Sequence, residues 1–154
     1  MHSIHKLEVY KELQRELEER KKQMNKPYFE EDFISIEFDA SHNWLYVDWK
    51  GYQIEGSVMA GCERMLEALI EYKCSKVLND NTNVIGIWTP AAKWVGENWL
   101  PRMEKAGLKY FAWVYSPSAL SQVSTNTAIT HTSKKEIIHT FYSIDLAKEW
   151  LQSV

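Results

Sequence analysis

The stretch from Lys76 to Trp99, KVLNDNTNVIGIWTPAAKWVGENW, contains the residues best suited to chemistry or binding. A short apolar segment is expected to end in Asn79-Asp80-Asn81, and a helix is expected to begin at Thr89-Pro90. In open α/β sheets, ligands bind beyond the carboxyl ends of the strands, and this cluster would lie at such an end. The N–H groups at the start of the next helix would suit an anion. The alternative, which we favour, is that short amide and carboxylate side chains stabilise a turn.

Two hydroxyl residues near this stretch, Thr89 and Ser116, each precede a proline, which is the pattern of a helix cap followed by a first-turn proline. The candidate ligand- or partner-binding residues are therefore Asn79, Asp80, Asn81, Thr82, Trp88, Thr89 and Ser116.

Seven tryptophans is a high number for a chain of 154 residues. Trp99, Trp113 and Trp150 fall on predicted inward stripes, so we expect them in the core. The others are harder to place, although a core position remains the expectation for each of them. If some lined an exposed cleft, they would suit a protein partner or a small apolar ligand. These less easily placed residues are Trp44, Trp49, Trp88 and Trp94.

Motifs of common catalytic sites are absent from the sequence, which has no GxSxG, P-loop or GxGxxG. The five histidines show no spacing typical of metal ligands. The two cysteines, Cys62 and Cys74, form no CxxC and are expected to be reduced thiols of a cytoplasmic protein. The sequence thus predicts no enzyme activity, no metal site and no cofactor.

Length and composition narrow the class of protein further. A chain of 154 residues with 45% hydrophobic and 25% charged residues fits one globular domain. The net charge of −3 gives no basic footprint for nucleic acid. No stretch approaches the ~18 apolar residues of a membrane span, and the start of the chain is charged and unlike a signal peptide. We therefore expect a cytoplasmic location.

Residues 1–30 are predicted to form an N-terminal helical arm that ends at Pro27. Its apolar stripe is thin, so the helix alone would be only marginally stable. The arm would pack on the domain or on a second subunit, or it would be a solvated and partly frayed extension. The stripe consists of Leu7, Tyr10, Leu13 and Leu17.

Residues 31–154 are predicted to form one α/β domain with the order β-β-α-β-α-β-α-β-α and a mixed sheet flanked by helices. Apolar and polar residues alternate over 34–39 and 44–49, which predicts a hairpin. Helical spacing begins near Ser57, an expected cap, and Pro101 should kink or restart the helix that begins at Thr89. The Thr- and Ser-rich segment 124–135 is expected to be a helix end and a mobile loop. Ser143 is the expected cap of the last helix.

The segments KVLND (76–80), AAKWVGENWLPRMEKAGLKYFAWVYSP (91–117) and FYSIDLAKEWL (141–151) resemble a bacterial family of sporulation anti-anti-sigma-like proteins with a STAS fold, also described as CRAL-TRIO-like. The resemblance covers roughly residues 33–154 and implies the fold more than an activity. Related anti-sigma-factor antagonists carry a phospho-acceptor serine in an Asp-Ser-Ser-Gly-like stretch. The corresponding region, Asn79 to Thr89, has no serine, so this phospho-switch is not expected here.

Taken together, the residues and the resemblance predict a binding or regulatory module that docks a protein partner or a second copy of itself. Docking would use the segments Asn79–Pro90 and Ser116–Lys135. The alternative is a carrier of a small apolar molecule or a lipid, which the CRAL-TRIO resemblance and the tryptophans suggest.

Overall fold

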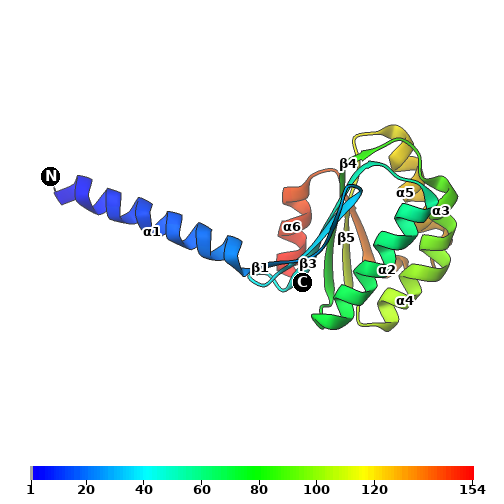
Figure 1. The fold of residues 1–154 in the computed structure, drawn as a ribbon, viewed down its shortest axis with the longest axis horizontal. Coiled ribbons are helices and arrows are strands. Elements are labelled where there is room, and N and C mark those ends of the chain that lie inside the picture. Colours follow the sequence, from blue (N-terminus) through cyan, green and yellow to red (C-terminus); the bar gives the residue numbers. More distant parts are fainter. Residues whose placement is uncertain (1) are drawn as a thin grey trace.

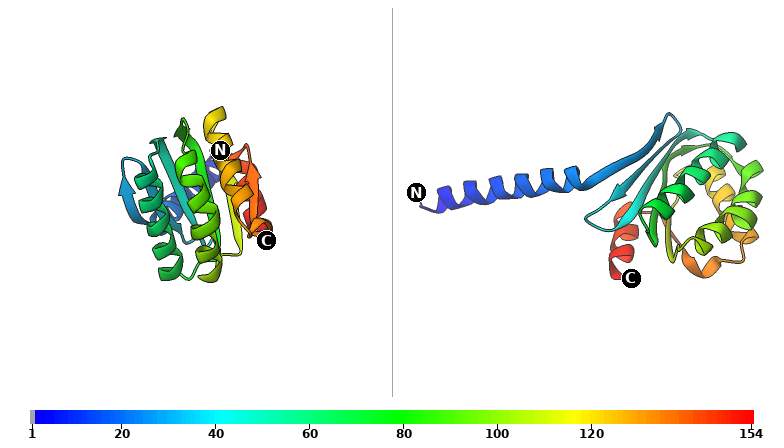
Figure 2. Two further views of the ribbon diagram at one scale, coloured as in Figure 1. Left: turned by 90° about the vertical axis from the view of Figure 1, so that its right-hand side faces the viewer. Right: turned by 60° about the horizontal axis from the view of Figure 1, so that its bottom comes forward.

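The computed structural model describes residues 2–154, without the side chains of residues 2 and 21–24. The chain begins with a helix, α1 (His2–Met24), which extends away from the rest of the molecule (Figures 1 and 2). Every side chain from residue 3 to residue 20 is exposed. The predicted arm is therefore a helix, and the domain does not cover it.

The remaining chain builds one six-stranded sheet whose strands lie side by side in chain order. The first three strands are antiparallel, and the last three run parallel to the third. This confirms the predicted α/β class with a mixed sheet. The strands are β1 (Asn25–Glu31), β2 (Ile34–Asp39), β3 (Trp44–Tyr52), β4 (Lys76–Ile85), β5 (Tyr110–Val114) and β6 (Ile138–Phe141).

Helices cover the two faces of the sheet unequally (Figure 1). One face carries α2 (Glu55–Glu71), the long helical segment 89–105 and α5 (Ala119–His131), while α6 (Ile144–Ser153) packs alone on the other. The segment 89–105 comprises α3 (Thr89–Trp94), a π-helical turn η1 (Val95–Trp99) and α4 (Leu100–Lys105). A short 3-10 turn, η2 (Lys135–Ile137), precedes β6. The larger core therefore lies under α2 to α5.

The predicted arm is wrong over its last residues, because 25–31 form strand β1 instead of continuing as a helix or coil. The strand pairs with β2 through a two-residue turn, Asp32-Phe33. Its sequence, NKPYFEE, lacks clear alternation and contains Pro27, which lies at an irregularity in the pairing. Proline is tolerated on an edge strand, where one side of the backbone needs no partner. The domain thus has one strand more than the sequence predicted.

Local helix signals were correct in some places and wrong in others. Ser143 caps α6 as predicted, accepting a hydrogen bond from the backbone N–H of Leu146. Pro101 follows the π-helical turn, which fits the predicted disturbance because proline offers no N–H to the preceding turn. Ser57 is not the N-cap residue, since α2 begins earlier, but from the first turn its hydroxyl accepts a hydrogen bond of 3.0 Å from the backbone N–H of Ile54, the residue that precedes the helix. The predicted helix end and loop over 124–135 agrees with the structure, in which α5 continues to His131 and a short irregular segment follows it.

None of the helices in the described part of the chain combines the length and the apolar character that crossing a membrane requires.

Candidate functional site

The Asn79-Asp80-Asn81 cluster lies inside strand β4 and does not form the predicted turn. Pairing between β4 and β5 ends at Asp80 and Val114, whereas β4 continues beside β3 as far as Ile85. All three polar side chains are buried, with exposed fractions of 3%, 4% and 4%. The interpretation as turn chemistry was therefore wrong, because pairing with β3 extends the strand through a polar segment that looks like a strand end.

Asn79 and Asn81 point to the face of the sheet that α2 to α5 cover, and they line a small cavity there. Asn79 Oδ1 accepts a hydrogen bond of 2.9 Å from the indole nitrogen of Trp49. Among the described residues, no protein group bonds the amide nitrogen of Asn79 or the side chain of Asn81. A buried amide without a partner is costly unless water or a ligand satisfies it. These two amides, together with the indole nitrogen of Trp113, are therefore polar groups that the cavity offers to a guest.

Tryptophans form much of the cavity wall, as the high tryptophan content suggested. Besides Trp49, two of them bond to the protein itself: Trp88 Nε1 donates to Ser121 Oγ at 3.3 Å, and Trp99 Nε1 donates to the Cys62 carbonyl at 2.7 Å. Trp113 keeps its indole nitrogen buried without a partner among the described residues. The cavity volume is about 30 Å³, which is room for roughly one or two water molecules. Its tryptophans are Trp49, Trp88, Trp99 and Trp113.

The chemistry available in this cavity is that of neutral binding. None of its lining residues is an acid or a base of the Asp, Glu, Lys, Arg or His type. Burial raises the pKa of the Cys62 thiol well above its ordinary value, and the nearby Glu63 carboxylate adds to the rise. The thiol therefore stays protonated and is a poor nucleophile. A charged guest would lose its hydration here without gaining a counter-charge, so only a neutral guest fits.

Asp80 points to the opposite face of the sheet and makes three hydrogen bonds there. Its carboxylate accepts from Tyr46 Oη at 2.8 Å, from the Thr82 N–H at 3.0 Å and from Thr82 Oγ1 at 2.5 Å. Burial together with the Asp80 carboxylate raises the pKa of Tyr46, so the phenol remains the donor. This arrangement links β3 to β4 and gives Asp80 and Thr82 a structural role.

The two predicted caps, Thr89 and Ser116, do not cap helices. Thr89 begins α3 but its hydroxyl lies 2.9 Å from Ser124 Oγ, on α5. Ser116 precedes α5 by three residues and donates to the Val84 carbonyl at 2.6 Å. The sequence pattern identified hydroxyls near helix starts, but tertiary contacts between the β4–α3 and β5–α5 connections determine what these hydroxyls bind.

A surface that the sequence reasoning missed lies beyond the carboxyl ends of β3, β4 and β5. Six apolar side chains there are between 50% and 76% exposed. Their segments are connected: Tyr52 pairs with Ile85, the Tyr52 ring packs against Gly86, and the Gly86 N–H bonds Ser118 at 3.4 Å. We refer to this region as the carboxyl-edge surface. It consists of Tyr52, Ile54, Ile85, Ile87, Leu120 and Val123.

One signal in the sequence could have revealed this surface. Residues 81–92 and 110–130 contain no Asp, Glu, Lys or Arg, although a quarter of the whole chain is charged. The structure places the start of each helix in these two segments at the same edge of the sheet. Long uncharged segments that reach the surface are unusual and indicate contact with something other than water.

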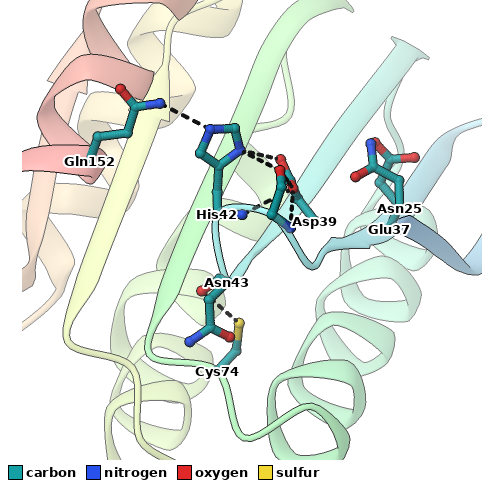
Figure 3. Close-up of polar contacts among 8 residues, drawn as sticks. Asn25, Glu37, Asp39, His42, Asn43, Cys74 and Gln152 are labelled. Carbon is teal, nitrogen blue, oxygen red and sulfur yellow. Dashed lines mark hydrogen bonds and ion pairs between the residues drawn. The ribbon is translucent and has the colours of Figure 1, made fainter. Parts of the chain in front are cut away.

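A second polar cluster lies at the opposite end of the sheet, around the β2–β3 turn (Figure 3). His42 Nδ1 lies 2.7 Å from Asp39 Oδ2, and its Nε2 lies 3.0 Å from Gln152 near the end of α6. Burial would raise the pKa of Asp39, but hydrogen bonds from Ser41 and His42 outweigh it and lower the pKa below its ordinary value. The ring of His42 also stacks on Trp44, with centroids 4.3 Å apart. This cluster connects the β2–β3 turn to the end of α6.

Of the candidate residues, Asn79, Asn81 and Trp88 meet at the cavity, whereas Asp80 and Thr82 lie on the opposite face of the sheet. Thr89 contacts α5 through Ser124, and Ser116 bonds the end of β4. No group of three or more His, Cys, Asp or Glu side chains in residues 2–154 could hold a metal ion.

The chain matches no protein-family model, and a search of characterised proteins also gives no match. The STAS-like resemblance therefore rests on the sequence segments alone.

Proposed function

We propose that this protein is a binding module without catalytic activity, and that it docks an uncharged, apolar segment of a partner protein on its carboxyl-edge surface. The observation that carries the proposal is the group of six exposed apolar side chains on three neighbouring connections. Exposed apolar side chains that gather at one place commonly mark an interaction site. The location agrees with the general rule that open α/β sheets bind at the carboxyl ends of their strands.

The charge distribution supports a protein partner of this chemistry. Interface centres are depleted of charged residues, and the two segments that contribute Ile85, Ile87, Leu120 and Val123 contain none. A nucleic acid or an acidic surface would need basic groups that these segments do not supply. An apolar partner segment would lose little hydration on contact and would bury the exposed isoleucines.

Hydrogen bonds beneath the carboxyl-edge surface hold it in one shape. Ser116 joins the end of β4, at the Val84 carbonyl, to the start of α5, where its Oγ accepts from the Ser118 N–H at 2.9 Å. Ser124 accepts from the Trp88 N–H at 2.9 Å, which fixes the β4–α3 connection to α5. A surface ordered before binding loses less conformational entropy when the partner arrives.

The proposed setting is the cytoplasm. Both cysteines, Cys62 and Cys74, are free and buried, as expected of a protein kept in a reducing compartment. The resemblance to anti-sigma-factor antagonists agrees with a regulatory binding role, and a phospho-switch is not part of this proposal.

The test compares two isoleucines with similar exposure at opposite ends of the domain. Ile87→Glu places a charge in the carboxyl-edge surface, and Ile70→Glu places the same charge at the end of α2. Both proteins, immobilised, are used to capture partners from a lysate, and the affinity of each captured partner is then measured. We expect Ile87→Glu to weaken binding about tenfold or more and Ile70→Glu to leave it unchanged. Equal binding by both variants, or turnover of a small substrate by the purified protein, would refute the proposal.

A small neutral ligand is a second candidate, favoured by the unpartnered amides of Asn79 and Asn81 in the cavity. In its present shape the cavity has room for water but not for a lipid, so a carrier role would require the wall to open. Native mass spectrometry of gently purified protein tests this candidate. A retained mass that Asn81→Leu removes would support it, whereas a clean protein mass would leave docking as the remaining proposal.

A further inference from the structure

Helix α1 exposes a row of apolar side chains that nothing in the described chain covers. The helix has 23 residues, and the five side chains of the row are between 48% and 62% exposed. An isolated helix is only marginally stable in water, and helices in proteins are usually stabilised by packing one face. A surface that binds a partner would account for this row. We call it the α1 stripe, and it consists of Ile4, Leu7, Tyr10, Leu13 and Leu17.

The spacing of the α1 stripe suits another helix. Leu7, Tyr10, Gln14 and Leu17 follow one another at intervals of three, four and three residues, the pattern of the two inward positions of a coiled-coil heptad. A single polar residue in such a row, here Gln14, favours one register over others. Leu13 lies beside the row and widens it. The occupant of this stripe is therefore expected to be a helix.

The chain's own domain cannot be that occupant. Strand β1 begins at Asn25, directly after the last helical residue, so no loop allows α1 to fold back. The helix runs away from the domain in Figure 1 and in the right-hand view of Figure 2. Covering the stripe within one chain would require β1 to leave the sheet, where it pairs with β2 over six residue pairs. The partner must therefore come from another molecule.

Charge makes a second copy of α1 a suitable partner. Between residues 3 and 20 the helix has four basic and five acidic side chains, a net charge of −1, and the two signs are interspersed. A strongly charged partner gains nothing from such a surface, whereas two copies of it, each with a net charge of −1 over these residues, meet without strong overall repulsion. The four basic residues are Lys6, Lys11, Arg15 and Arg20, and the five acidic residues are Glu8, Glu12, Glu16, Glu18 and Glu19.

The neighbouring sheet edge does not offer a competing route to self-association. The free edge of β1 has Lys26, Pro27, Glu30 and Glu31, all exposed. Charged side chains and proline on an edge strand protect it from pairing with another sheet. Of the two unpaired features at this end of the molecule, only the helix is suited to pairing.

We propose that α1 pairs with α1 of a second copy as an antiparallel two-helix coiled coil. Orientation follows from the shape of the molecule, because the domain continues roughly in line with the helix (Figure 1). In a parallel pair both domains would lie at the same end and compete for the same space. In an antiparallel pair they lie at opposite ends of a rod about 35 Å long, since 23 residues rise about 1.5 Å each. The dimer then presents two carboxyl-edge surfaces, far apart.

The main test uses two substitutions that place a glutamate on opposite sides of α1. Leu17→Glu lies in the α1 stripe, and Arg15→Glu lies about 200° around the helix from Leu17, at an exposed side chain outside the stripe. Sedimentation equilibrium of the full chain at concentrations up to about 100 μM measures the dimer dissociation constant. We expect Leu17→Glu to raise this constant about a hundredfold or more, because two leucines leave the interface, and Arg15→Glu to change it little.

A monomer across the whole concentration range, or equal loss of dimer in both variants, would overturn the proposal. Neither substitution should disturb folding of the domain, because neither residue contacts the core. The near-UV circular dichroism of the domain should therefore be unchanged in both variants. Ile87→Glu should remain dimeric, so failure of this proposal and failure of the proposed docking function are distinguishable.

Orientation is tested with a spin label on the variant Ser3→Cys, which lies in the inward row four residues before Leu7. The native thiols are buried and should not react with the label. The antiparallel pair predicts a separation between the two labels on the order of 30 Å along the rod, whereas a parallel pair would bring them within about 10 Å. A short distance would refute the antiparallel arrangement.

Discussion

Asn79 and Asp80 are neighbours in the sequence but have different hydrogen-bond partners, because successive side chains of a strand point to opposite faces. On the face that α2 to α5 cover, Asn79 accepts a hydrogen bond from the indole N–H of Trp49. On the other face, Asp80 accepts three hydrogen bonds. Both side chains are nearly inaccessible to solvent. A partner cannot touch Asp80 in the folded protein, so substitutions there should act on stability.

The first prediction concerns Asp80→Ala. Removing the carboxylate leaves the Tyr46 hydroxyl and the Thr82 N–H without their acceptor in a partly buried place. We expect the free energy of unfolding to fall by about 1–3 kcal/mol, measured by urea denaturation. Partner binding by the fraction that remains folded should be unchanged.

Asp48→Ala is the matched control, because Asp48 is the residue paired with Asp80 on β3. Burial raises the pKa of Asp48, and although a hydrogen bond from Asn83 opposes this, the Asp80 carboxylate adds to the rise. Its charge is thus poorly stabilised in the folded state at neutral pH. We expect this substitution to cost much less than Asp80→Ala; equal losses would contradict the structural role of Asp80.

At the scale of elements, the helical segment 89–105 packs unusually closely against α5. The π-helical turn places Gly96 against α5, where an added methyl group would collide with the carbonyl oxygen of Ala128 and crowd His131. Thr89 and Trp88 bond Ser124 on the same helix. The two helical segments therefore fix each other, and they fix the connections that carry the carboxyl-edge surface.

The prediction at this scale is that Gly96→Ala loosens this packing. Because the collision is with backbone, the helices must separate, and we expect the free energy of unfolding to fall by about 1–3 kcal/mol. Gly56→Ala is the control, since a methyl group there meets nothing within 4 Å. It lies in α2 and should stabilise the protein by about 0.4–1 kcal/mol. Thermal melts of both variants measure the difference, and a neutral Gly96→Ala would argue against the close contact.

At the scale of the whole molecule, α1 and the domain are almost independent in stability. All described side chains from residue 3 to residue 20 are exposed, so the helix contributes no core contacts. Helix α6 behaves differently, because Ala147 and Leu151 are buried in the smaller core with Trp44 and Leu78.

Deleting residues 1–24 should therefore change the free energy of unfolding by less than about 0.5 kcal/mol when measured on dilute, monomeric protein. Deleting residues 144–154 exposes the smaller core and should abolish cooperative unfolding. A large loss on removing α1 would mean that the helix packs on the domain in solution.

Periodicity in the sequence determined much of this architecture. The alternation of Ile34 and Ile36 with polar residues, and the helical spacing of Val58, Cys62 and Met65, place these side chains in the core. Such signals are local, since one buried face repeats at a fixed interval. The α/β class, the mixed sheet and the N-terminal helix followed from them.

Tertiary structure alone decided the rest. Strand β1 has a charged, proline-containing sequence and exists because β2 supplies its hydrogen bonds. Strand β4 continues through Asn79-Asp80-Asn81 because β3 continues beside it and because Trp49 and Tyr46 donate hydrogen bonds to Asn79 and Asp80. The carboxyl-edge surface gathers residues that are far apart in the sequence. Each of these features depends on a distant partner, which no short stretch of sequence can specify.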